Sequence, residues 1–253
     1  MSETKIALIT GASRGLGKAM ALHLARAGRD LILTYHSKRA EAEAVAGEIA
    51  GLGRKAVVLQ LDVAESASFP AFAAKVKAAL AQTWRRDDFD FLVNNAGTAL
   101  YAPFMQTTEE QFDQAMAVHF KSTFFLTQKL VPLIKDGGRI VNISSGLARF
   151  SLPGSSAYGS MKAAIETLTR YMAKELGPRR IAVNVIAPGA IETDFGGGRV
   201  RNDRELNAFI AGQTALGRVG LPDDVGAAVA ALLADDNVWI NGQRIEVSGG
   251  INL

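Results

Sequence analysis

The sequence contains no cysteine and only three histidines, His23, His36 and His119. A chain without thiols forms neither disulfides nor thiolate metal sites, and three imidazoles are too few for a histidine-rich metal site. No apolar run is long enough to cross a bilayer. The first residues lack the basic region and long apolar core of a secretion signal. These absences predict a cytoplasmic protein with no metal site and no membrane partner.

A concentration of positive charge is also missing. The net charge is +3 over 253 residues, but basic side chains alternate with acidic ones, as in the stretch WRRDDFD. Nucleic-acid-binding proteins more often gather Lys and Arg on one stripe or helix. We therefore predict no nucleic-acid partner. At 48% hydrophobic residues, the chain is long enough to bury the core of one large α/β domain, and we predict a single domain over residues 1–253.

Short apolar runs alternate along the chain with longer segments of helical period. The predicted strands are 5–10, 30–35, 55–61, 90–95, 139–144, 181–187 and 243–248. The predicted helices are 15–28, 40–53, 69–82, 109–134, 157–176 and 222–234. Nearly continuous Val, Ile and Leu runs are typical of parallel strands covered on both faces. The alternation predicts an α/β fold with a doubly wound (Rossmann) parallel sheet of about seven strands.

One segment interrupts this alternation. Between Pro188 and about Gly220 the chain is long and includes three consecutive glycines, Gly196 to Gly198. Connections of this length are usually lids or disordered segments. We predict a hinged substrate lid at about 190–220, with a floppy surface insertion as the alternative.

A glycine-rich turn, TGASRGLG, follows the first predicted strand and leads into a helix. Gly11 allows a tight turn, Gly15 lets backbone approach a pyrophosphate, and Gly17 packs the helix on the strand. The helix N-terminus adds free N–H groups and a positive dipole end. The turn therefore predicts a dinucleotide site. Its predicted residues are Gly11, Ser13, Arg14, Gly15, Leu16 and Gly17.

The end of the second predicted strand indicates which dinucleotide binds. An NAD site would place a carboxylate there, but the chain has Tyr35, followed by His36, Lys38 and Arg39. Guanidinium and ammonium groups suit a 2′-phosphate. We predict NADP(H), bound by these four residues together with Arg14. The alternative is that Lys38 and Arg39 simply start an exposed helix.

The stretch SSAYGSMKAA places Tyr158 four positions before Lys162, hence on one face of a helix. A neighbouring cation favours the phenolate form of a tyrosine and lowers its pKa. The alternative is a surface tyrosine and a solvated lysine.

Taken together and in this order, the motifs resemble the short-chain dehydrogenase/reductase family over nearly the whole chain. The resemblance rests on TGASRGLG, LDV, NNAG, YGSMK, PGAIETD and a serine thirteen residues before Tyr158. It implies further cofactor-binding residues, which are Asp62, Val63, Asn95, Ala96, Gly97, Pro188, Gly189, Ile191 and Thr193.

The resemblance also implies catalytic roles. Tyr158 would be the general acid, and Lys162 would lower the pKa of the phenol and hold the nicotinamide ribose. Ser145 would donate a hydrogen bond to the substrate oxygen as negative charge develops.

Residue 119 departs from the family pattern, which has a fourth catalytic residue, an asparagine, where this chain has His119. In the family this residue interrupts the helix, and its main-chain carbonyl helps hold a water linked to the lysine. That role survives substitution if the helix distortion persists. The imidazole could also relay protons, or it could be a packed histidine with reduced activity as the result. We predict a working enzyme with an altered relay.

The pattern indicates a substrate only by class, a small-molecule carbonyl or alcohol. The resemblance is closest to 3-oxoacyl-[acyl-carrier-protein] reductases. Arg199, Arg201 and Arg204 in the lid suit an acidic substrate or are simply solvated. Alternatives are an NAD(P)-dependent sugar or alcohol dehydrogenase and a weakly catalytic NADP-binding sensor. The family usually forms homotetramers or dimers, so we expect a homo-oligomer.

Overall fold

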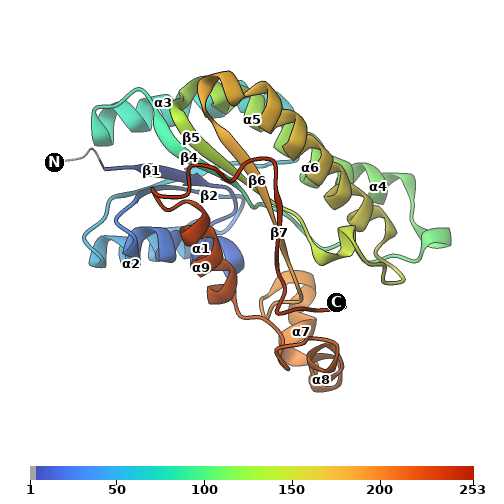
Figure 1. Ribbon diagram of the computed structural model, residues 1–253. Helices are drawn as coiled ribbons and strands as arrows, with labels where there is room; N and C mark the ends of the chain where they lie inside the picture. The colour runs from blue at the N-terminus through green and yellow to red at the C-terminus, as the bar shows by residue number, and fades with distance from the viewer. Residues whose placement is uncertain (1–3) are drawn as a thin grey trace.

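Seven parallel strands form one sheet in the order β3-β2-β1-β4-β5-β6-β7 (Figure 1). This computed structural model describes residues 4–253. The strands are β1 (Ile6–Ile9), β2 (Asp30–Tyr35), β3 (Ala56–Gln60), β4 (Phe89–Asn94), β5 (Ile134–Ile143), β6 (Ala182–Pro188) and β7 (Arg244–Val247). The strand order changes direction between β1 and β4, which opens a crevice at the carboxyl edge where such sheets bind ligands. The predicted fold class is confirmed.

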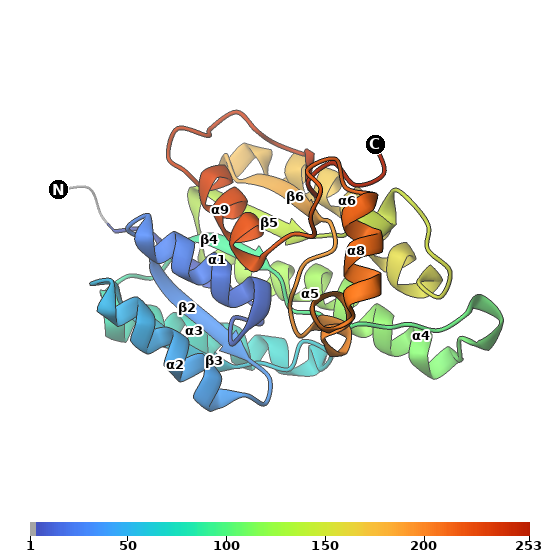
Figure 2. The ribbon, with the colours of Figure 1, turned by 90° about the horizontal axis from the view of Figure 1, so that it is seen from below.

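Helices cover both faces of the sheet (Figures 1 and 2). One face has α1 (Gly15–Arg26), α2 (Arg39–Gly51) and α9 (Pro222–Leu232); the other has α3 (Phe69–Trp84), α5 (Ser122–Leu130) and α6 (Ser156–Glu175). Successive residues of β1 point to opposite faces, so Ala7 and Ile9 join one core while Ile6 and Leu8 join the other. Burial on both sides explains why the strands are continuous apolar runs.

The single helix predicted over 109–134 is wrong. The segment is divided into α4 (Glu109–Ala115), a π-helical turn (Met116–Lys121), α5 and a 3₁₀ turn (Val131–Leu133), and β5 already begins at Ile134. Pro132 has no N–H to continue an α-helix, which accounts for the early end. The hydroxyls of Ser122 and Thr123 donate to the carbonyls of Val118 and His119, satisfying groups within the widened turn.

The segment between β6 and α9 is more ordered than a long loop. It includes a 3₁₀ turn (Phe195–Gly198), α7 (Arg199–Asn202) and α8 (Arg204–Gly212). Gly196, Gly197 and Gly198 all have positive φ, at 61°, 74° and 74°, a conformation that favours glycine. The Asp203 carboxylate accepts from two N–H groups of α8 and caps it. Figure 1 shows α7 and α8 outside the helical layers, near the C-terminus.

Candidate active site

The glycine turn leaves room for an anion at the start of α1. Gly11 has φ +66°, and a Cβ on Gly17 would lie 2.1 Å from the Gly11 carbonyl oxygen, so neither position tolerates a side chain. No side chain caps the first N–H groups of α1. These free donors and the closely approaching backbone fit the pyrophosphate of a dinucleotide.

The NNAG segment holds this turn in place. The Asn95 side-chain amide donates to the carbonyls of Thr10 and Gly11 at 2.8 and 3.0 Å. The Thr10 hydroxyl accepts from the backbone N–H groups of Asn95 and Ala96. Asn94 donates to Asn142 of β5 at 2.8 Å, a partner that sequence analysis missed because it is an isolated amide in an apolar strand. NNAG therefore connects the glycine turn to the middle of the sheet.

The basic residues after β2 are exposed and paired locally. Lys38 lies 3.6 Å from Glu41, Arg39 lies 2.8 Å from Glu43, and α2 begins at Arg39. Both side chains thus start an exposed helix, as the alternative interpretation holds. His36 Nε2 is 3.4 Å from Asp62. Exposed pairs of this kind contribute little to stability, so these cations can exchange partners readily.

Ser145, Tyr158 and Lys162 converge at the carboxyl end of β5. Ser145 is the second residue after the end of β5, and the other two lie on the first two turns of α6. The Ser145 side chain lies close enough to the Tyr158 hydroxyl to lower its pKa. Lys162 Nζ donates to the Ile143 carbonyl at 2.8 Å and lies 5.6 Å from the Tyr158 ring centroid. The structure therefore brings the three predicted residues together.

Burial dominates the protonation of this group. Burial raises the pKa of Tyr158 to about 12, against a smaller lowering by the Ser145 hydrogen bond. Burial also lowers the pKa of Lys162 to about 8. The predicted lowering of the Tyr158 pKa by Lys162 stays a prediction, because the lowering here comes from Ser145 and is smaller than the effect of burial. At neutral pH Tyr158 keeps the proton that a general acid must donate.

Two further side chains, Glu166 and Arg244, hold the serines that follow β5, and the sequence analysis did not predict them. The Glu166 carboxylate accepts from the Ser144 hydroxyl and from Arg244 Nε, each at 2.7 Å. Arg244 also donates to the Ser145 carbonyl at 3.4 Å. Glu166 and Arg244 are 78 residues apart, so no local pattern could have indicated their pairing.

His119 lies in the π-helical turn and is only 2% exposed. Its Nε2 is 2.9 Å from the Thr98 carbonyl, and its ring meets Tyr158 edge-on at 5.1 Å between centroids. Burial and the positive charge of Lys162 lower the pKa of His119 to about 3. The imidazole is therefore neutral at physiological pH and packed beside the tyrosine. The helix distortion on which a main-chain role depends is present.

The PGAIETD segment lies against the glycine turn. A Cβ on Gly15 would be 3.7 Å from the Thr193 side chain, and the Thr193 hydroxyl accepts from Phe195 N–H at 3.1 Å. Pro188 ends β6, and Gly189 approaches Ser248 so closely that a Cβ would lie 2.9 Å away. Ile191 pairs with Gly220, which joins the two ends of the segment between β6 and α9. The predicted cofactor residues therefore follow the carboxyl ends of β1, β2, β3, β4 and β6.

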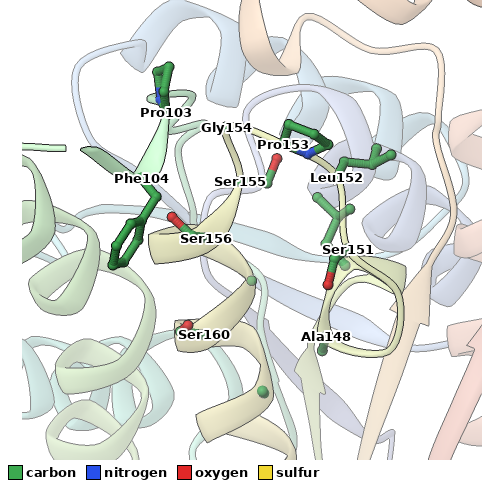
Figure 3. A pocket seen from close by; sticks show the side chains of 13 residues that line it. Pro103, Phe104, Ala148, Ser151, Leu152, Pro153, Gly154, Ser155, Ser156 and Ser160 are labelled. Atoms are coloured by element: carbon green, nitrogen blue, oxygen red, sulfur yellow. The ribbon is translucent and has the colours of Figure 1, made fainter. Parts of the chain in front are cut away.

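A cavity of about 730 Å³ lies beside the catalytic group without including it. Figure 3 shows Phe104 on one wall, Leu152 on the opposite wall, and Ser156 and Ser160 of α6 between them. These serines are on a different face of α6 from Tyr158 and Lys162. Each serine is two residues from Tyr158, which places it on nearly the opposite side of the helix. Sequence analysis did not anticipate this cavity.

Two properties are absent from residues 4–253. No helix there has both the length and the apolar character needed to cross a membrane. No cluster of three or more His, Asp or Glu side chains there could hold a metal ion.

Comparison with known proteins identifies the family. The chain matches the family described as Enoyl-(Acyl carrier protein) reductase over residues 11–252. It is 37% identical to the hydroxynaphthalene reductase-like protein Arp2 of Metarhizium brunneum, covering 97% of this chain and 94% of that protein. The protein therefore belongs to the short-chain dehydrogenase/reductase family, whose members are oxidoreductases that use nicotinamide cofactors.

Solved structures narrow the comparison to reductases. The promiscuous reductase LugOII, which catalyses keto-reduction at C1 in lugdunomycin biosynthesis, is similar with a TM-score of 0.93 and 37% identity, covering 99% of both chains. The angucycline C-6 ketoreductase LanV with bound NADP has a TM-score of 0.92 and 34% identity, covering 97% of this chain and 95% of that one. Similarity to such reductases supports carbonyl reductase activity.

Proposed function

We propose that this protein is an NADPH-dependent carbonyl reductase that converts the C=O group of a small molecule to an alcohol. The observation that supports it most is that the hydroxyls of Ser145 and Tyr158 meet at the carboxyl end of β5, with Lys162 Nζ 5.6 Å from the centre of the Tyr158 ring. Both hydroxyls can donate to one carbonyl oxygen. Their position, where the carboxyl edge of the sheet meets the glycine turn, is the usual ligand position in this fold.

Each residue has one task in the reaction. The bound cofactor supplies the hydride that the carbonyl carbon accepts. Tyr158 gives its phenolic proton to the carbonyl oxygen, and Ser145 donates a hydrogen bond to that oxygen while negative charge develops. Lys162 stabilises the phenolate left behind until Tyr158 is reprotonated. His119 packs against Tyr158 as a neutral ring and takes up no proton, and its main-chain carbonyl accepts a hydrogen bond from the Thr123 hydroxyl.

The charge of the side chains at the end of β2 favours NADP(H) over NAD(H). β2 ends in Tyr35 rather than a carboxylate, and His36, Lys38, Arg39 and Arg14 offer cationic or neutral donors nearby. Their present acidic partners are exposed, so a 2′-phosphate can replace them. The NADP bound in LanV supports the same choice.

The substrate is best described as a ketone. The relatives named above are a hydroxynaphthalene reductase-like protein, an angucycline C-6 ketoreductase and a keto-reductase of lugdunomycin biosynthesis. A 3-oxoacyl thioester is the second candidate. The family description names an acyl carrier protein, and the exposed Lys174 is a basic side chain suited to docking an acidic carrier. Asp136, ion-paired to Arg179 at 2.8 Å, weakens the case for docking an acidic carrier.

We also propose that residues 190–220 form a substrate lid and that the protein is a single domain located in the cytoplasm. A homo-oligomer, a tetramer or dimer, would cover Phe124 and Phe125 of α5, which are each 40% exposed. Sedimentation velocity would measure the number of subunits.

Oxidation of NADPH, followed by its absorbance, tests the central proposal. The substrate panel contains aromatic ketones, β-ketoacyl thioesters, ketoses and aldehydes. We expect Tyr158→Phe to lower kcat by about 10³-fold, because it removes the general acid. The Kd for NADPH should stay within about twofold of wild type, because the phenol is not needed to cradle phosphates. Unchanged turnover in the variant would contradict the catalytic role. Tight NADPH binding without turnover of any substrate would instead favour the sensor.

A further inference from the structure

The lid and the loop that follows β4 meet above the catalytic tyrosine. The Phe195 ring, in the lid, lies 6.1 Å from the Tyr158 ring between centroids. A Cβ on Gly196 would lie 3.5 Å from the Ala99 side chain, and the Arg199 guanidinium lies 5.6 Å from the centre of the Tyr101 ring. The two segments therefore enclose the approach to Tyr158.

Tyr101 is held in place although it is 65% exposed. Gly154, with φ +84°, lies against it so closely that a Cβ would be 2.5 Å from the ring. The Ala102 N–H donates to the Gly154 carbonyl at 2.9 Å. Phe195 is 46% exposed on the other side of the approach. Two fixed aromatic rings exposed at the mouth of a site are suited to contact with a flat apolar ligand.

Arg199 differs from the other arginine of α7. Arg201 is ion-paired to Asp194 at 2.7 Å, and Arg14 lies 3.4 Å from the same carboxylate. Among residues 4–253, no Asp or Glu lies within ion-pair distance of Arg199, and its guanidinium lies over the Tyr101 ring. Asp194, the neighbouring acid, is already engaged by two cations. Arg199 therefore presents an uncompensated positive charge at the mouth.

We propose that Tyr101, Phe195 and Arg199 select a ketone that combines a planar aromatic ring with an anionic oxygen, such as a carboxylate or an ionised phenol. The ring packs on Tyr101 and Phe195, the anion pairs with Arg199, and the carbonyl reaches Tyr158. This proposal rests on the proposed function, since it assigns the substrate class of the same site.

Three matched ketones separate the contribution of the aromatic ring from that of the negative charge. The probes are 2-acetylnaphthalene, 6-acetyl-2-naphthoate and the ring-free 7-oxooctanoate, each assayed for kcat/KM with NADPH. Arg199→Gln should lower kcat/KM about tenfold for acetylnaphthoate and less than about twofold for acetylnaphthalene, because only the former loses a charge-assisted contact. Tyr101→Leu should lower kcat/KM several-fold for both naphthyl ketones and leave 7-oxooctanoate nearly unchanged.

Arg204→Gln is the matched control, since it removes an equal charge from exposed α8 of the same lid. We expect it to change none of the three values by more than about twofold. Equal losses for the neutral and anionic naphthyl ketones in Arg199→Gln would overturn the proposal. An Arg204→Gln effect as large as that of Arg199→Gln would overturn it too.

A binding measurement keeps the two proposals distinguishable. Titration calorimetry of 2-naphthoate, which contains no reducible ketone, into the NADPH-loaded protein should show binding that Arg199→Gln weakens about tenfold and Arg204→Gln does not. If this holds while no ketone is reduced, the proposed function fails and the ligand site stands. If ketones are reduced but naphthoate binds both variants equally, the ligand site fails and the reductase stands.

Discussion

Titratable side chains are buried at the carboxyl end of β5 and exposed in the proposed lid. Around β5, Lys162 and His119 are 6% and 2% exposed; burial lowers the pKa of Lys162 to about 8, and burial together with the charge of Lys162 lowers that of His119 to about 3. In the lid, Asp194 and Arg201 are exposed and pair with each other in water. Proton donation requires groups whose protonation the protein controls, which needs burial. Recognition of varied ligands requires donors that can change partners, which needs exposure.

The largest effect should come from the buried glycine turn, where backbone contacts leave no space. In Gly17→Ala the new Cβ would meet the Gly11 carbonyl at 2.1 Å and the Asn95 amide at 2.8 Å. Backbone cannot move aside without opening the phosphate cradle. We expect destabilisation of about 1–3 kcal/mol and NADPH affinity at least about 100-fold weaker, measured by thermal unfolding and by fluorescence titration.

Gly47→Ala is the control for that substitution. Gly47 is an exposed interior residue of α2, and a Cβ there meets nothing within 4 Å. Because alanine favours helix over glycine, this variant should be more stable by about 0.5–1 kcal/mol with unchanged NADPH affinity. Equal NADPH affinity in the two variants would show that the turn at Gly17 does not form the cradle.

A smaller effect is expected from the buried histidine, as a dependence of stability on pH. The pKa of His119 is about 3 in the folded protein, against 6.5 as the ordinary value. Between these values the unfolded chain binds a proton that the folded chain does not, so stability falls as pH falls through this window. From pH 7 to pH 4, wild type should lose about 3 kcal/mol more of its unfolding free energy than His119→Asn.

Urea unfolding at pH 7, 5.5 and 4 measures that difference. The comparison uses the slope of stability against pH, so a loss of packing in the variant cancels. His36→Asn, which removes an exposed imidazole, serves as the control substitution. Parallel slopes for wild type and His119→Asn would mean that the imidazole is not held neutral by burial.

The smallest effects should arise where the lid meets the glycine turn, at the ion pair between Arg14 and Asp194. Arg14→Gln should weaken NADPH binding about tenfold and NADH binding hardly at all, because only NADPH offers a 2′-phosphate. Asp194→Asn should strengthen NADPH binding about two- to threefold by releasing Arg14. Paired dissociation constants for NADPH and NADH measure both. Equal weakening of the two cofactors in Arg14→Gln would remove the case for NADP(H).

The parts that local pattern predicted well are those that local physics controls. The strands and the glycine turn follow from continuous apolar runs and from spacing along the chain. Prediction was poorer where an element's limits depend on its neighbours. The helix expected over 109–134 ends early and widens at His119, and the loop expected after Pro188 contains α7 and α8.

In the site, too, features set by local spacing were predictable and contacts between distant residues were not. Helical spacing places Tyr158 and Lys162 on one face of α6, and Ser145 was expected beside them through the family resemblance. The support from Glu166 and Arg244, and the approach of Arg199 to Tyr101, were not, because each joins residues far apart in the chain.

The sequence by itself determined the alternation of strands and helices, the cradle of glycines and the residue types available for proton transfer. Only the tertiary structure decided how those residues are charged. A phenol beside a lysine has a lowered pKa when both are in water, yet here burial raises the pKa of Tyr158 and lowers that of Lys162. The reason is that desolvation depends on everything packed around a group, which no spacing along the chain encodes.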